Sequence, residues 1–189
     1  MPDITPHNTI AQLITGRRTI YEFKPAPVPS PAVMREAIAA ARWAPNHRLT
    51  EPWHFYLLGP ESIQGVIQLN TGLVVKKYGE KDGLEKQRRW ARIPGWMVLT
   101  CDHSGDSVRD REDYAACCCA AQNLMLYLWH QGIGVKWNTG AVILDPGIYD
   151  LLWIDPAVET VVGIFWYGYP EEIPVTERKP VEQIIIELP

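Results

Sequence analysis

Cysteine is scarce in this 189-residue chain, and its placement suits neither a metal site nor a disulfide framework. Three of the four cysteines are consecutive, at Cys117, Cys118 and Cys119, while Cys101 ends an apolar run without an evident partner. Successive side chains on a helix diverge by about 100°, so the triple run cannot converge on one ion. With no Cys-x-x-Cys spacing, the sequence favours small core residues, and a reactive thiol is the weaker alternative.

A long unbroken hydrophobic run is also missing. The longest apolar stretch, 114–129, is interrupted by Gln122 and Asn123, so it falls short of the roughly 18 apolar residues of a membrane span. The first residues show neither the basic region nor the apolar core of a secretory signal. We therefore expect a cytoplasmic protein without a membrane partner, in which this stretch forms a buried helix.

The charge pattern lacks the basic stripe that would gather nucleic acid. The formal net charge is −4, and the arginines are scattered or paired. No internal repeat or low-complexity linker divides the sequence, and its length suffices for a real core. The expectation is a single domain spanning residues 1–189, with no nucleic-acid partner.

Start and stop signals predict alternating helices and strands. Thr5 and Pro6 are expected to open a helix that stops at Gly16, and Ser30 with Pro31 to open one that ends before Pro45. Further elements are expected as strands at 53–58, 97–101, 135–137 and 160–167, helices at 61–69 and 112–131, and a short helix after Pro146. Together they indicate an α+β layer architecture.

Two segments give weaker signals. Residues 71–92 are basic and mixed, with no clear period, so we expect a mobile excursion there, whose basic part, 76–92, is a candidate lid over the pocket. The tail, 176–188, contains Ile184, Ile185 and Ile186, which are too apolar to hang in water. It is expected either to pack on another chain or to add a strand.

An arginine pair follows the first predicted helix. Arg17 and Arg18 can offer planar forks of donors to a phosphate, and the Thr19 hydroxyl can complete the cradle. The alternative is a solvated pair near a helix end, where cations are favourable anyway. Arg178, in a second basic group near the end of the chain, is a further phosphate donor or simply part of a solvated tail.

Two other segments suit a flat ligand. Residues 132–140 place three glycines around Trp137, which lets a ring approach the backbone, although a helix C-cap followed by a strand explains much of the pattern. His47 lies in a loop bounded by prolines, where it can donate to a ligand or make only a local hydrogen bond. Trp43 adjoins that loop and can stack on a ring. No arrangement typical of a hydrolase is present.

The order of these motifs resembles the nitroreductase family over nearly the whole chain. The motifs that carry the resemblance are Arg17-Arg18-Thr19, then Ala44-Pro45-Asn46-His47 with Glu51-Pro52-Trp53, the alanine-rich helix, Gly132 to Gly140 around Trp137, Gly168-Tyr169-Pro170 and Arg178-Lys179-Pro180. Each is modestly specific, but their shared order is not expected by chance.

The resemblance implies an intertwined α+β homodimer with a mainly antiparallel central sheet, a long core helix, and two FMN molecules at the subunit interface. By position, Arg17, Arg18 and Thr19 would bind the phosphate and ribityl end, with Arg178 as a further phosphate contact. The full set assigned to the cofactor in this way is Arg17, Arg18, Thr19, Tyr21, Trp43, His47, Trp137, Asn138, Thr139 and Arg178. No catalytic side chain is assigned, because the flavin carries the chemistry.

The implied activity passes electrons from NAD(P)H through FMN to a nitroaromatic, a quinone or a similar small acceptor. Three positions depart from the family pattern. Tyr21 stands where many members have a basic residue for the flavin N1 and O2 edge, and Leu49 and Glu51 replace the usual loop asparagine and glutamine. Donors at the pyrimidine edge are then left to His47 or Arg48.

These departures keep other readings open. One is a non-catalytic flavin-binding or sensing protein that has lost efficient hydride transfer. Another is a reductive dehalogenase or flavin-consuming enzyme on the same fold, and a third is a structural α+β module whose arginines are only surface groups.

Overall fold

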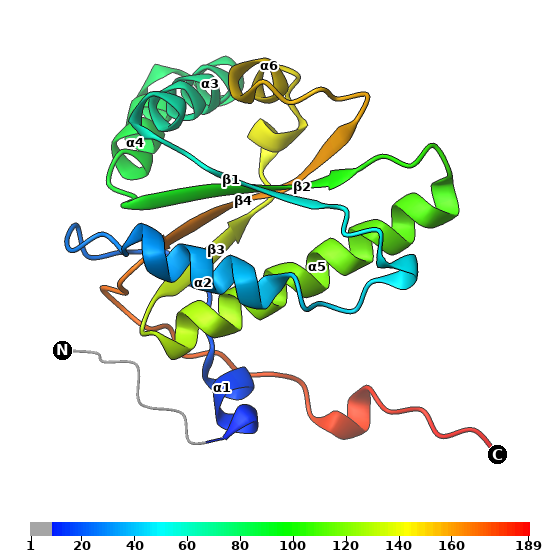
Figure 1. Cartoon of the computed structure of the whole chain (residues 1–189). Coiled ribbons are helices and arrows are strands. Elements are labelled where there is room, and N and C mark those ends of the chain that lie inside the picture. Colours follow the sequence, from blue (N-terminus) through cyan, green and yellow to red (C-terminus); the bar gives the residue numbers. More distant parts are fainter. Residues whose placement is uncertain (1–8) are drawn as a thin grey trace.

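The computed structural model describes residues 9–189 and is built on one four-stranded antiparallel sheet (Figure 1). The strand order is β1 (Trp53–Leu57), β2 (Gly95–Asp102), β4 (Glu159–Gly168) and β3 (Gly134–Asn138). All three strand pairings are antiparallel. β4 is apolar on both faces because it lies inside the sheet, as its sequence predicts.

Helices α2 (Pro31–Ala41) and α5 (Ser107–His130) cover one face of the sheet (Figure 1). α5 starts five residues earlier than predicted, because the Asp106 carboxylate accepts hydrogen bonds from the Val108 and Arg109 amides and caps the helix. Its buried side chains recur at spacings of three and four and pack on α2 and the sheet. The predicted buried helix is therefore confirmed.

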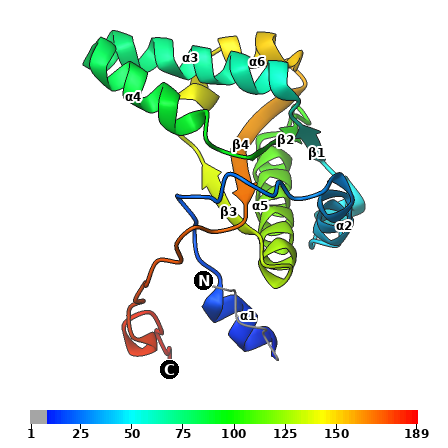
Figure 2. The ribbon, with the colours of Figure 1, turned by 90° about the vertical axis from the view of Figure 1, so that its left-hand side faces the viewer.

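The opposite face carries α3 (Pro60–Tyr78), α4 (Glu80–Trp90) and α6 (Gly147–Leu152), as Figures 1 and 2 show. The prediction that residues 71–92 lack regular structure is wrong. The two helices are separated only by Gly79, which has a φ of 98°. The sequence of this segment shows no clear helical period of apolar residues, because α4 buries only Gly83 and Trp90 and turns its charges to solvent.

Trp90 fixes α4 to the sheet. Its ring centroid lies 5.5 Å from that of Trp96 and 5.0 Å from that of Trp166, in edge-on geometries that aromatic pairs favour. Gly83 lets the neighbouring helix approach, because a Cβ there would lie 2.3 Å from a Val75 methyl. The segment expected to be a lid is thus part of a packed layer.

The two ends of the described chain lie on the α5 side of the sheet. α1 (Ile10–Gly16) is capped by Thr9; the predicted start at Thr5 and Pro6 lies outside the described residues. The segment after α1 runs beside β3 through a parallel bridge between Thr19 and Val135. Beyond Pro170 the tail extends away from the body, as Figures 1 and 2 show, with only the short 3-10 turn η3 (Val181–Gln183) and no added strand.

The cysteines divide between core and surface. Cys101 and Cys117 are buried, Cys118 is partly buried, and Cys119 is exposed, so the prediction that the whole run fills the core is wrong for Cys119. Cys101 does have a neighbour: the free thiol of Cys117 lies beside it, and the interaction with Cys101, followed by burial, raises the pKa of Cys117. In the described part of the chain, no helix is long and apolar enough to cross a membrane.

Gly163 keeps room for Trp137, because a Cβ at this position would lie 2.1 Å from the indole nitrogen. We expect Gly163→Ala to lower the free energy of unfolding by about 1–3 kcal/mol through overpacking. Guanidinium denaturation measures this change. The matched control is Gly72→Ala on α3, where a Cβ meets nothing within 4 Å, so helix propensity should raise stability by up to about 1 kcal/mol. Equal effects of the two substitutions would contradict the packing argument.

Candidate functional site

Three arginines from the two ends of the chain meet at one pocket of about 320 Å³. Arg17 and Arg18 directly follow α1, and Arg178 comes from the extended tail. The helix α5 supplies Gln122 to the wall. The complete lining is Ile14, Thr15, Arg17, Arg18, Gln122, Thr176 and Arg178.

The electrostatics of this pocket suit an anion. None of its lining residues is acidic, so the three guanidinium groups face one another without a neutralising carboxylate. Burial, followed by the charges of Arg178 and Arg18, lowers the pKa of Arg17. Arg18 is held in place by donating from Nη1 to the carbonyl oxygens of Thr15, at 2.6 Å, and Arg17, at 3.0 Å. A phosphate would relieve the repulsion and use the free donors.

Tyr21 lies beyond this pocket, next to a cation that the sequence analysis missed. The Lys136 ammonium lies 4.7 Å from the centroid of the Tyr21 ring and 4.7 Å from that of Trp166. Burial, followed by the charges of Arg89 and Lys86, lowers the pKa of Lys136. Although Tyr21 itself carries no charge, the fold therefore places a positive charge beside it.

The three consecutive candidates on and after β3 do not share one surface. Trp137 stacks on Phe165, with ring centroids 5.2 Å apart, and donates from Nε1 to the Val162 carbonyl at 3.2 Å. Asn138 points to the other face because side chains alternate along a strand. Its buried Nδ2 has no hydrogen-bond partner, while Thr139 is exposed. Trp137 thus belongs to the α5 side, and Asn138 does not.

The loop with Trp43 and His47 lies far from the arginine pocket within one chain. Trp43 is 79% exposed and His47 is exposed. The loop is tied to α5 at Asp113, whereas the pocket meets α5 at Gln122. These positions are nine residues apart, which is about 14 Å along a helix. One chain therefore brings together Arg17, Arg18 and Arg178, but not the loop residues.

Two residues that matter here were missed by sequence reasoning. Lys136 gave no signal, because its contact with Tyr21 joins segments over a hundred residues apart. Asp113 did give one. It precedes Ala116, Cys117 and Ala120 at helical spacings of three, four and seven, which places a carboxylate on the buried face of α5.

The crowded charges predict an unusual response to mutation in the free protein. We expect Arg17→Ala to leave the free energy of unfolding within about 0.5 kcal/mol of the original, or to raise it, because repulsion from Arg178 and Arg18 is relieved. Thermal unfolding without and with inorganic phosphate tests this. Phosphate should stabilise the original protein more than the variant. A marked loss of stability without phosphate would show that Arg17 is a structural residue instead.

Comparison with known proteins gives one consistent family. The model of the nitroreductase family matches residues 14–169. YfhC of Bacillus subtilis, named as an NAD(P)H nitroreductase, is 31% identical over 98% of this chain and 97% of its own. The crystal structure of a nitroreductase-like family protein from Bacillus cereus has a TM-score of 0.87 at 25% identity, covering 97% of this chain and 98% of the other.

A nitroreductase from Desulfovibrio desulfuricans, solved in complex with FMN, has the same fold, with a TM-score of 0.77 at 20% identity over 97% of this chain and 98% of the other. The fold predicted from the resemblance, an α+β architecture on a mainly antiparallel sheet, is confirmed. With the family model covering most of its length and a full-length relative above 30% identity, the chain belongs to the nitroreductase family.

Proposed function

We propose that this protein is an FMN-dependent oxidoreductase that takes electrons from NAD(P)H and delivers them to a nitroaromatic, a quinone or a similar small acceptor. Family membership supports the reaction class. The observation that supports FMN as the cofactor is the pocket where Arg17, Arg18 and Arg178 converge without an acidic neighbour. That donor set fits a phosphate monoester, which is the anionic end of FMN.

Each bound cofactor needs two copies of the chain. The arginine pocket holds the phosphate end, while the exposed Trp43 and His47 lie at the far end of α5 and offer their side chains to a neighbouring molecule. The tail supports a homodimer, because Ile184, Ile186 and Leu188 are 66–85% exposed in the single chain. A second copy that covers the tail would also complete the site.

The side chains bind and orient rather than react. When bound, FMN supplies the redox chemistry of accepting a hydride and passing electrons on. The three arginines fix one end of the cofactor, and Trp137 provides a rigid apolar wall because its ring is locked between Phe165 and the Val162 carbonyl. Lys136 keeps a positive charge beside Tyr21, the position that many family members fill with a base. The charge missing from residue 21 is thus present nearby, on the face of β3 opposite to Trp137.

The direct experiment measures the affinity of the protein for FMN and the rate at which NADH or NADPH reduces the bound FMN. We expect the original protein to bind about one FMN per chain and to bleach rapidly with NADH or NADPH in anaerobic stopped flow. Arg17→Ala should weaken FMN binding by about 1–3 kcal/mol, roughly 5- to 150-fold, since it removes charge-assisted hydrogen bonds. Arg88→Ala is the control, because Arg88 is exposed on α4, across the sheet from the pocket.

Each possible failure of this experiment has a separate meaning. A protein that stays colourless after incubation with FMN would refute the proposed cofactor. Bound flavin that neither nucleotide bleaches would favour the flavin-binding or sensing alternative. Equal affinities for the Arg17→Ala and Arg88→Ala proteins would place the phosphate elsewhere.

The shared site predicts complementation between two defective chains. Arg17→Ala spoils the phosphate end and His47→Ala spoils the loop, so each homodimer should be impaired at both sites. A mixed dimer, isolated with two different tags, should contain one intact and one doubly altered site and recover about half of the original activity per dimer. Steady-state reduction of an acceptor measures the recovery. No gain in the mixed dimer would mean that one chain builds the whole site.

A further inference from the structure

The loop that carries His47 has a backbone that needs to be held. In residues 46–51, three non-glycine residues have positive φ: Arg48 at 62°, Leu49 at 51° and Glu51 at 48°. Few such residues occupy the left-handed region, and several in one short loop persist only where surrounding contacts fix them. Leu49 is 81% exposed, so packing of its side chain does not supply that restraint. The restraint has to come from polar contacts.

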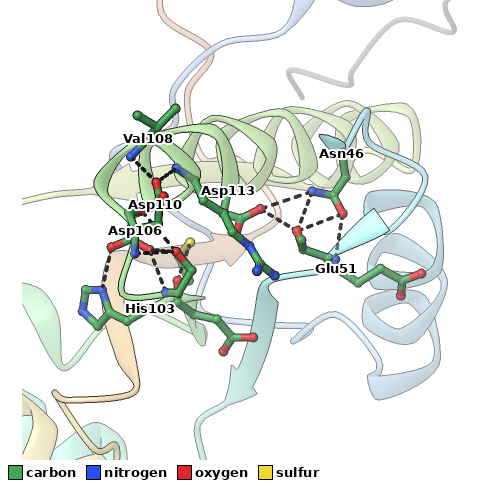
Figure 3. A network of polar contacts seen from close by, with 12 residues as sticks. Asn46, Glu51, His103, Asp106, Val108, Asp110 and Asp113 are labelled. Atoms are coloured by element: carbon green, nitrogen blue, oxygen red, sulfur yellow. Dashed lines mark hydrogen bonds and ion pairs between the residues drawn. The ribbon is translucent and has the colours of Figure 1, made fainter. Parts of the chain in front are cut away.

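A directed chain of hydrogen bonds ties the loop to one carboxylate on α5 (Figure 3). The Thr50 hydroxyl donates to Asp113 Oδ1 at 2.5 Å, and its oxygen accepts from Asn46 Nδ2 at 2.9 Å. The amide oxygen of Asn46 in turn accepts from the backbone N–H of Glu51 at 2.7 Å. A carboxylate with its proton removed can only accept hydrogen bonds. Asp113 therefore decides which group is donor and which is acceptor at each step of this hydrogen-bond series.

The donor and acceptor order of this hydrogen-bond series matters because the series ends at Glu51, a residue with positive φ. With its Nδ2 turned to Thr50 and Asp113, Asn46 must present its oxygen to the amide of Glu51. Asp113 itself is only 2% exposed, and its other oxygen lies 3.5 Å from Arg109 Nε. A buried carboxylate with these partners is a firm anchor, because it cannot turn to water.

We propose that Asp113 is a positioning residue of the active site, which holds the loop 46–51 so that His47 and Arg48 meet the flavin ring of the partner chain. The inference rests on the proposed function. Asp113 does not contact the cofactor. It acts through Thr50 and Asn46, and its removal should loosen the loop while the arginine pocket, about 14 Å away along α5, stays intact.

The test compares Asp113→Asn with Asp110→Asn. Both changes remove one carboxylate from the first part of α5, but Asp110 accepts from the Ser104 amide and hydroxyl and lies near His103, and among the described residues it makes no hydrogen bond to the loop 46–51 (Figure 3). Brief trypsin treatment followed by mass spectrometry measures cleavage after Arg48, which is exposed in the loop. We expect Asp113→Asn to raise this cleavage rate about tenfold and Asp110→Asn to leave it unchanged.

The second measurement is made on the same proteins loaded with FMN. For Asp113→Asn we expect FMN to remain bound at about one per chain, while its reduction in stopped flow, by whichever of NADH and NADPH reduces the original protein, slows about tenfold because the ring is less well placed. Thr50→Val should reproduce both effects. Thr50→Ser keeps the hydroxyl and should behave like the original protein in both measurements. Circular dichroism confirms that every variant is folded.

Two results would overturn the inference. In one, Asp113→Asn behaves like Asp110→Asn in both measurements. In the other, cleavage after Arg48 increases but flavin reduction does not change, so that the carboxylate only stabilises the loop. Failure of the original protein to bind FMN is a separate outcome, which refutes the proposed function and leaves the cleavage result to report on the loop alone.

Discussion

The packing of α5 between α2 and the sheet is the constraint on which the rest depends. Its buried side chains recur every three or four residues, so the helix has a fixed rotation about its axis. That rotation points Asp113 toward the loop 46–51 and lets Gln122 reach the arginine pocket. A single rigid helix thereby sets the distance between the arginine pocket and the loop, which one chain contributes to the two different sites of the proposed dimer.

Stability and function make opposite demands at both ends of this helix. Arg17, Arg18 and Arg178 crowd positive charge into one pocket. Without a bound anion, this crowding does not add to the stability of the protein. The loop 46–51 carries strained residues that a purely structural turn would replace with glycine. Such local violations in an otherwise consistent fold are typical of functional sites. The surrounding core tolerates them because both sheet faces are covered by tightly packed layers.

The sequence predicted the elements whose signals are local. Ser30 and Pro31 do open α2, the strands lie where the apolar runs are, and β4 has the two apolar faces of an inner strand. It failed for residues 71–92, because α4 is attached mainly through Trp90, and one buried aromatic side chain does not make a period. It also placed the start of α5 too late, because Asp106 was read as part of a loop.

For the site, the sequence by itself determined which groups are available: an early arginine pair, a late arginine, and a loop with a histidine and a tryptophan. Only the tertiary structure decided their partners. Arg178 meets Arg17 across the length of the chain, Lys136 lies over Tyr21, and Asp113 controls a loop more than sixty residues before it. The reason is physical: charge and hydrogen-bonding act through space over a few ångströms, whereas sequence patterns record only neighbours along the chain.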